Sequence, residues 1–309
     1  MNTQSRSTPV PGVRKAQPLA LKKSASVGSL AEALLRECGE QVRVNASVVQ
    51  AGGPAEGLHQ LRVGLRRLRT VERLLRPLSG TKALRQLASD AQWLGREVSL
   101  GRDLGALRLD VVQPVAKLFP AEAGFTLLEA ALTKRAARAR PVVEAALTCT
   151  QGTAFLAKLA PDALKPYGDH TGAARDLARV SLEAALGRVR RRALGLADFS
   201  DEERHDLRKA LKHLRYAVDL LRPLYAEKAT AAYLKQIKAL QEILGSLNDF
   251  STAQAHFCGK DAPCRDNPDA QRAVGLILGV RRAEAEQDWR HAEALWAKID
   301  GAKPFWRRG

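Results

Sequence analysis

His59-Gln60-Leu61-Arg62-Val63-Gly64-Leu65-Arg66-Arg67-Leu68-Arg69 is the stretch that decides this fold, because the chain carries a second copy of it. The copy reads His205-Asp206-Leu207-Arg208-Lys209-Ala210-Leu211-Lys212-His213-Leu214-Arg215 and stands 146 positions later (205 − 59 = 146). The same offset relates the Leu-Leu-Arg-Pro-Leu segments at 74–78 and 220–224, and then Asp103 and Asp249. Similarity at one fixed offset marks an internal repeat. The sequence therefore predicts a duplicated unit.

Each copy has the spacing of a helix with a basic face beside an apolar face. At about 100° per residue, residues three, four and seven positions apart share a face. The basic face holds His59, Arg62, Arg66, Arg69 and Arg73 in the first copy, and His205, Arg208, Lys212 and Arg215 in the second. The apolar face holds Leu61, Leu65, Leu68 and Leu75 in the first copy, and Leu207, Leu211, Leu214, Val218 and Leu221 in the second.

The basic faces reduce the stability of the two helices, which indicates that the charges have a function. Each like-charged pair four residues apart, such as Arg62 with Arg66, destabilises an isolated helix by about 0.2–0.5 kcal/mol. Glu72 is the only acidic residue of the first run, and it falls on the apolar side. A helix rises about 1.5 Å per residue, so a positive group recurs about every 5 Å. This spacing favours a long polyanion over a single small anion.

The composition agrees with a polyanionic partner. Lys and Arg number 50 against 33 Asp and Glu, for a formal net charge of +17. The four cysteines show no Cys-x-x-Cys spacing, which favours a reducing compartment over a disulfide scaffold. No apolar run reaches the about 20 residues that span a membrane, and the first residues lack the apolar stretch of a secretory signal. We therefore expect a cytoplasmic protein without a membrane span.

The periodicity predicts an all-α protein of two similar halves. Two four-helix units are expected at 28–150 and 171–300, joined by a linker at 151–170 with one short helix. Residues 1–27 are expected to form a disordered basic tail, and residues 301–309 a C-terminal tail. The expected helices cover about 29–51, 56–76, 81–99, 122–148, 172–196, 201–222, 228–248 and 268–300, with a kink or break at Pro141.

The duplicated helix, together with the segments 94–103 and 240–249 that follow it, resembles the CHAD domain, the conserved histidine α-helical domain. The resemblance covers about residues 28–300. It implies two four-helix bundles related by a pseudo-twofold axis, whose basic helices line a central pore or groove that binds inorganic polyphosphate. It also implies association with polyphosphate granules, or in some members with polyhydroxyalkanoate granules and their proteins.

The resemblance assigns polyphosphate binding to the basic positions His59, Arg62, Arg66 and Arg69 of the first copy, and to His205, Arg208, Lys212 and Arg215 of the second. Further candidate binding residues are Arg73, Lys82, Arg135, Lys209, Lys228, Arg281 and Arg282. Many relatives carry a triphosphate-tunnel domain before this region, and residues 1–27 are too short to be one. We expect a stand-alone, non-catalytic binding protein.

Several residues have alternative interpretations. His59 and His205 either strengthen anion binding as the pH falls or are buried histidines bonded to a carboxylate. We interpret Asp103 and Asp249 as caps or partners of arginines. His256, Cys258 and Cys264 fit no standard zinc spacing, so no metal or cofactor is expected.

Two rival functions remain. DNA binding through the same basic surface is favoured by the net charge, although no helix-turn-helix, zinc-finger or RRM motif is present. An enzyme that transfers phosphoryl groups would need a nucleophile, a base and metal ligands, and no matching carboxylate cluster is found.

Overall fold

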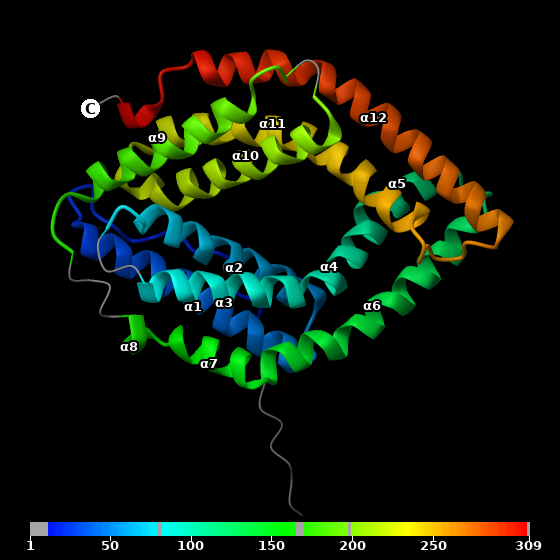
Figure 1. The fold of residues 1–309 in the computed structure, drawn as a ribbon, viewed down its shortest axis with the longest axis horizontal. Helices are drawn as coiled ribbons and strands as arrows, with labels where there is room; N and C mark the ends of the chain where they lie inside the picture. The colour runs from blue at the N-terminus through cyan, green and yellow to red at the C-terminus, as the bar shows by residue number, and fades with distance from the viewer. Residues whose placement is uncertain (1–11, 79–81, 165–169, 197–198, 308–309) are drawn as a thin grey trace, which may run out of the picture.

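The computed structural model describes residues 12–78, 82–164, 170–196 and 199–307 (Figure 1). Within these ranges the chain is helical, and the only β-type pairing is an isolated bridge between Ser26 and Ala173. The predicted all-helical class is confirmed. None of the described helices combines the length and the apolar character that crossing a membrane requires.

Nine helical segments lie within residues 12–78 and 82–164, the described part of the first half. They are α1 (Val27–Gln50), α2 (Ala55–Leu75), α3 (Lys82–Glu97), α4 (Ser99–Ala106), the π-helical η1 (Leu107–Val112), α5 (Gln113–Ala116), α6 (Gly124–Thr148), α7 (Thr150–Lys158) and α8 (Pro161–Leu164). The second half contains α9 (Ala174–Arg192), α10 (Asp201–Leu221), the 3-10 turn η4 (Arg222–Leu224), α11 (Glu227–Cys258), α12 (Pro268–Gly301) and the 3-10 turn η5 (Phe305–Arg307).

The duplicated stretches form α2 and α10, whose first and last residues are both 146 positions apart. Ser200 begins α10 with a capping box, in which its hydroxyl accepts from the Glu203 amide and the Glu203 carboxylate accepts from the Ser200 amide. All the leucines and the valine of the two predicted apolar faces are buried, each 3% exposed or less. Burial of these apolar faces fixes the rotational orientation of each helix about its axis, and therefore the direction in which its basic face points.

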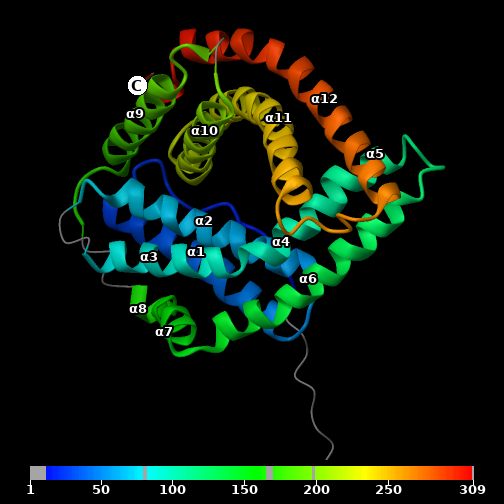
Figure 2. The same cartoon turned by 45° about the vertical axis from the view of Figure 1, so that its right-hand side comes forward.

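The helices pack around two hydrophobic cores. The larger core joins α1, α2 and α3 to α9, α10, α11 and α12, and the smaller one joins α4, η1, α5 and α6 to the end of α11 and the start of α12. Each core therefore contains side chains from both halves of the sequence. Figures 1 and 2 show α2 and α10 facing each other between the two groups of helices, and the two helices are in contact.

No helix was expected between the predicted helices at 81–99 and 122–148, yet the segment 99–116 is helical. Gly101, Gly105 and Pro114 interrupt its periodicity, but Pro114 lies in the first turn of α5, where a backbone N–H has no partner within the helix. The interpretation of Pro141 as a break is also wrong, because α6 continues through it.

The predicted disordered tail and the linker also differ from the structure. The Arg14 guanidinium and the Gln17 amide both donate to the carboxylate of Glu37 on α1, at 2.5 and 2.6 Å, and the Arg14 amide donates to Asn45. These bonds hold the part of the tail after residue 11 along α1, whereas residues 1–11 lie outside the described residues. The predicted linker contains most of α7 and all of α8 rather than one short helix.

The predicted C-terminal tail is part of the larger core. Phe305 and Trp306 are buried against Tyr225 and Tyr233 in edge-to-face aromatic contacts. The Trp306 indole donates to Glu183 at 2.8 Å. The burial of two large rings explains why these residues pack rather than extend into solvent.

Candidate functional site

The cations of α2 and α10 meet across the contact between the two helices. Arg66 on α2 donates from Nη1 to the hydroxyl of Tyr216 on α10 at 3.4 Å. The guanidinium of Arg66 lies 5.9 Å from the centre of the Tyr216 ring, and that of Arg215 lies 4.4 Å from it. Tyr216 therefore supports one arginine from each copy by cation–π contact.

A cavity of about 330 Å³ lies at this contact, and we call it the α2–α10 cavity. Six lining residues are Arg or Lys, namely Arg66, Arg69, Arg73, Arg208, Lys209 and Lys212. Thr70, His205, His213 and Tyr216 complete the described lining, which includes no Asp or Glu. Cations therefore predominate in this lining, which attracts anions, although Lys209 also pairs with the carboxylate of Asp206 at 2.6 Å.

A second cavity of about 520 Å³, the α4–α11 cavity, adjoins the first. The two share Arg66, His205, Arg208 and Lys212 as lining residues. The α4–α11 cavity adds Arg62 together with Asp110, Asp249 and His256. Its lining is thus of mixed charge, which makes the α2–α10 cavity the more strongly cationic of the two.

Arg62 has a structural contact as well as a place in this lining. Its Nη1 donates to the carbonyl oxygen and to the hydroxyl of Ser99, at 2.8 and 2.9 Å. Ser99 begins α4, so Arg62 ties α2 to the start of that helix. Substitution of Arg62 would therefore disturb packing as well as charge.

Mutual repulsion is visible in the electrostatics of the arginines. Partial burial, followed by the nearby Arg73 and Arg66, lowers the pKa of Arg69. Arg69 donates to the neutral amide oxygen of Gln92 at 3.2 Å, so this bond does not neutralise it. Glu72 is buried and bonds Arg76 at 3.0 and 3.1 Å, as expected for an acidic residue on the apolar side.

Eight of the fifteen predicted binding residues line one or both of these cavities. They are Arg62, Arg66, Arg69, Arg73, His205, Arg208, Lys209 and Lys212. Four others lie on the basic helices or at the starts of the next ones but outside both described linings: His59, Lys82, Arg215 and Lys228. Lys82 and Lys228 are exposed first-turn residues of α3 and α11.

The remaining three predicted residues, Arg135, Arg281 and Arg282, make intramolecular contacts and are not among the described lining residues of the two cavities. Arg135 on α6 donates to the carbonyl of Asp261, just after α11, and Arg281 on α12 donates to the carbonyls of Asp110 and Val111 in η1, at 2.6 and 3.0 Å. Arg282 bonds Glu286 on its own helix. Arg135 and Arg281 each connect one half of the sequence to the other, which indicates a packing role.

Sequence reasoning missed two basic residues of this region, His213 and Arg188. His213 lies on α10, is only 6% exposed and lines the α2–α10 cavity. Its signal was present, because His213 follows Lys209 by four positions and so shares its side of the helix. Arg188 lies on α9, outside the repeated stretch, where the offset gives no indication.

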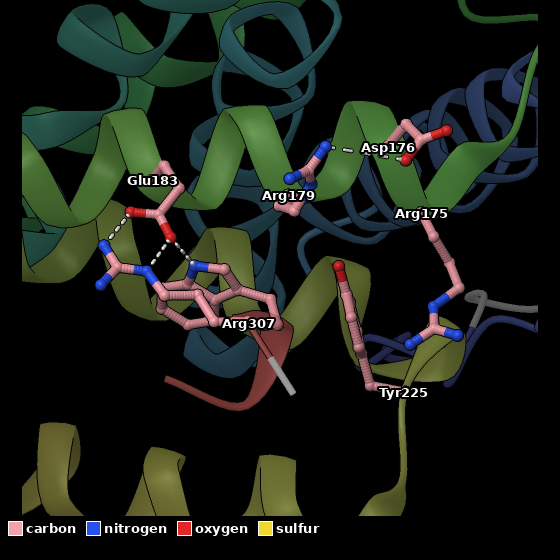
Figure 3. Close-up of a pocket in the computed structure, with 7 residues that line it drawn as sticks. Arg175, Asp176, Arg179, Glu183, Tyr225 and Arg307 are labelled. Atoms are coloured by element: carbon pink, nitrogen blue, oxygen red, sulfur yellow. Dashed lines mark hydrogen bonds and ion pairs between the residues drawn. The ribbon is translucent and has the colours of Figure 1, made fainter. Parts of the chain in front are cut away.

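A cavity near the C-terminus has a different character (Figure 3). It measures about 740 Å³ and contains Arg175, Arg179 and Arg307 beside the carboxylates of Asp176 and Glu183. Glu183 accepts both from Arg307 and from the Trp306 indole, so its charge is matched within the cavity. This mixed lining gives no continuous row of cations.

Asp249 lines the α4–α11 cavity, whereas Asp103 lies within α4 rather than at a helix cap. Over the described part of the chain, no three His, Cys, Asp or Glu side chains are grouped so as to hold a metal ion. His256 lines the α4–α11 cavity without the two cysteines.

Comparison with known proteins places this geometry in context. A family model of the CHAD domain matches residues 33–258, which is more than half of the chain. The crystal structure of the CHAD domain from the plant Ricinus communis is 28% identical, covers 95% of this chain and 98% of its own, and superposes with a TM-score of 0.79. PptA from Streptomyces chartreusis is 18% identical over 88% of this chain and 100% of its own, with a TM-score of 0.68, and shows the fold alone. A search of curated proteins finds no match.

Proposed function

The chain belongs to the CHAD domain family, and from this premise we propose that it binds inorganic polyphosphate without altering it. The cations of α2 and α10 form the site. The observation that carries the proposal is the α2–α10 cavity, where six Arg and Lys side chains converge from two helices and no carboxylate is found among the described lining residues. In this proposal, the two halves form four-helix bundles related by a pseudo-twofold axis, and the cavity is part of a central pore between them.

The chemistry of these side chains suits a chain of phosphates. A guanidinium is planar and permanently charged, and it donates two parallel hydrogen bonds to phosphate oxygens, while Lys adds a flexible point charge. Such charges repel one another in the free protein, and after partial burial the nearby Arg73 and Arg66 contribute to the lowered pKa of Arg69. A bound polyanion neutralises these charges and so reduces their repulsion. Part of the free energy of binding therefore comes from removing a repulsion that destabilises the folded protein when no ligand is bound.

Duplex DNA is the alternative ligand, and the net charge of +17 favours it. The position of the cations argues against it. The α2–α10 cavity has a volume of only about 330 Å³ and lies between two packed helices. A DNA duplex is too bulky to enter it, because the major groove, one part of the duplex, is already about 12 Å wide. A duplex would contact the outside of the molecule, while a single polyphosphate strand has the width to enter.

The decisive experiment compares two double variants that lose the same charge. Arg208→Gln/Lys212→Gln removes two cations that line both cavities. Lys82→Gln/Lys228→Gln removes two exposed cations outside them and serves as the matched control. Loss of two charge-assisted contacts is worth about 2–3 kcal/mol, so the first variant should bind long-chain polyphosphate roughly 50-fold more weakly. The control should change affinity less than about threefold.

Binding is measured at about 0.15 M salt, with duplex DNA as competitor and far-UV circular dichroism as a check of folding. Equal weakening by both variants would mean that net charge, not the cavities, determines affinity. If DNA displaces polyphosphate at equal phosphate concentration, nucleic acid rather than polyphosphate would be the favoured ligand.

The proposal includes the absence of catalysis. The pure protein should leave the length of labelled polyphosphate unchanged, with and without Mg²⁺. Shortening of the chain would instead support a phosphoryl-transfer enzyme.

Binding of this kind would target the protein to polyphosphate granules in the cytoplasm. A fluorescent fusion should co-localise with the granules, and the Arg208→Gln/Lys212→Gln variant should not. Localisation of that variant to granules would indicate recruitment by a granule protein rather than by polyphosphate.

A further inference from the structure

A third cavity, of about 560 Å³, opens between α2, α9 and α10, and we call it the α9 cavity. Its basic residues are Arg73, Arg76, Arg188 and His213. The three arginines are exposed and surround its mouth, whereas His213 is 6% exposed and forms part of its floor. The described lining contains no Asp or Glu.

The α9 cavity adjoins the proposed polyphosphate site. Arg73 and His213 line both the α9 cavity and the α2–α10 cavity. A chain of phosphates that passes Arg69 and Lys212 in the α2–α10 cavity therefore reaches Arg73 next. The cationic lining then continues beyond the two repeated helices, onto α9.

His213 has an unused hydrogen-bonding atom. Its Nδ1 is buried and has no hydrogen-bond partner. Buried polar atoms of folded proteins are nearly always bonded, and an exception calls for an explanation such as an absent ligand. Burial, followed by the nearby Arg73, Arg188 and Arg76, lowers the pKa of His213 to about 3. The imidazole is therefore neutral at pH 7 and offers one N–H donor.

The internal repeat provides a comparison within the same chain. Arg67 stands 146 positions before His213, on α2, and is also buried. Arg67 donates to Gln41 on α1 at 2.6 Å and lies 3.5 Å from the carboxylate of Glu37. In the first copy, Nη1 of Arg67 thus has partners from the protein, although its Nε is buried without one, whereas in the second copy His213 lines a cavity whose other basic residues are three arginines.

The arginines at the mouth differ in how far they are already engaged. Arg76 forms two bonds with Glu72 on its own helix. Partial burial, followed by the neighbouring cations Arg73, Arg191 and Arg76, lowers the pKa of Arg188. Arg188 is therefore placed among like charges, a position that an anion would stabilise.

We propose that Arg73, Arg76, Arg188 and His213 form a phosphoryl-binding subsite into which a polyphosphate chain extends from the α2–α10 cavity. The inference rests on the proposed function and deepens it, because it assigns a path and an additional contact. The arginines neutralise the phosphate charge, and Nδ1–H of His213 donates to a phosphoryl oxygen. Ser181 holds the wall in place, since its buried hydroxyl donates to the Leu74 carbonyl at 2.9 Å.

The test uses Arg188→Gln and the matched control Arg191→Gln. Both positions are exposed on α9, both changes remove one positive charge, and Arg191 does not line the cavity. The Arg188→Gln variant should bind long-chain polyphosphate about fivefold more weakly, as expected for one partly exposed charged contact. Its salt dependence should lose about 0.7 from the log–log slope. The control should bind within about twofold of the unaltered protein, and Arg188→Lys should retain more affinity than Arg188→Gln.

The second measurement reports on His213 directly. The imidazole signals of the six histidines are followed by NMR, and His213→Gln identifies the one that belongs to this residue. Long-chain polyphosphate should move the His213 signal in the unaltered protein and in Arg191→Gln, whereas orthophosphate at equal phosphate concentration should move it much less. A shift as large with orthophosphate would show a site for free phosphate and overturn the path.

The failures are distinguishable. Tight polyphosphate binding with an unmoved His213 signal, or with equal affinities of the two α9 variants, overturns the subsite and leaves the proposed function intact. An unaltered protein that does not bind polyphosphate overturns both.

Discussion

Replacement of His213 by Gln should change how the stability of the protein depends on pH. The ordinary histidine pKa of 6.5 applies to the unfolded chain, and burial beside Arg73, Arg188 and Arg76 lowers the pKa in the folded state to about 3. Between these two values, the unfolded chain binds a proton that the folded protein does not. The contribution of His213 to stability is therefore complete above pH 6.5 and is lost as the pH falls towards 3.

The size of the effect follows from this difference. Each pKa unit corresponds to about 1.4 kcal/mol, so the loss attributable to His213 should reach about 2–3 kcal/mol at pH 4.5. Gln has no proton to gain, so His213→Gln should lose less stability than the unaltered protein over the same range. Urea denaturation followed by circular dichroism, at pH 7.5, 6.0, 5.0 and 4.5, gives both curves.

The quantity compared is the slope of the free energy of unfolding against pH in the unaltered protein and in His213→Gln. Acidic residues that titrate below pH 5 affect the slope of both proteins alike. The variant's stability at pH 7.5 provides the reference, so any constant cost of the substitution cancels. Parallel curves down to pH 4.5 would refute the reasoning, since they would mean that His213 accepts a proton in the folded protein as readily as in the unfolded chain.

Three further outcomes follow from the contacts described above. The logarithm of the polyphosphate affinity should fall with the logarithm of salt concentration with a slope of about −5, from about 0.7 for each of the seven Arg and Lys that line the two cavities; a slope near zero would contradict charge-driven binding. Arg281→Gln should lower the free energy of unfolding by about 2–3 kcal/mol, because it removes the bonds that tie α12 to the carbonyls of Asp110 and Val111 in η1, yet leave polyphosphate affinity within twofold. Weaker binding by the folded variant would return Arg281 to the proposed site. Gly124→Ala should destabilise the protein by more than about 2 kcal/mol, because the added Cβ would lie 2.1 Å from the Asp269 carbonyl oxygen. Gly279→Ala should instead stabilise it by about 0.5–1 kcal/mol, because the added Cβ on α12 would lie in open space and Ala favours the helix. Similar urea midpoints for the two variants would contradict the packing of α6 on α12.

The parts of the fold that the sequence predicts well are those where periodicity and burial coincide. The ends of α2 and α10 were expected at 56–76 and 201–222 and lie at Ala55–Leu75 and Asp201–Leu221. In these helices, leucines recur at the spacing of one helix face, and the same leucines are the residues that the core buries. Local sequence and tertiary packing then give the same answer.

The fold was mispredicted where distant contacts decide the structure. Phe305 and Trp306 carry no periodic signal, and their burial depends on Tyr225 and Tyr233 about 80 residues away in the sequence. Arg14 is likewise held by Glu37 on α1. A composition rich in Ser, Pro and Lys predicts disorder only when no partner for the segment exists elsewhere in the fold.

The candidate site shows the same limit, because the repeat identifies corresponding residues without saying what they contact. Arg66 and Lys212 correspond, and both line the two cavities. Arg135 and Arg281 also correspond, yet each donates to the backbone of the other half. Duplication preserves packing contacts as readily as binding contacts, since both are repeated with the fold.

A difference between corresponding positions is therefore more informative than their similarity. Arg67 and His213 occupy the same place on the two repeated helices, and both are buried. Arg67 has Gln41 and Glu37 as partners of its Nη1 atom, although its Nε is buried without one, while Nδ1 of His213 has none. If both positions served packing alone, each would be expected to find partners within the protein, because an unsatisfied buried group costs about 1–3 kcal/mol. The unmatched imidazole lies where three arginines surround a cavity, so the asymmetry between the halves points to a ligand of negative charge at that place.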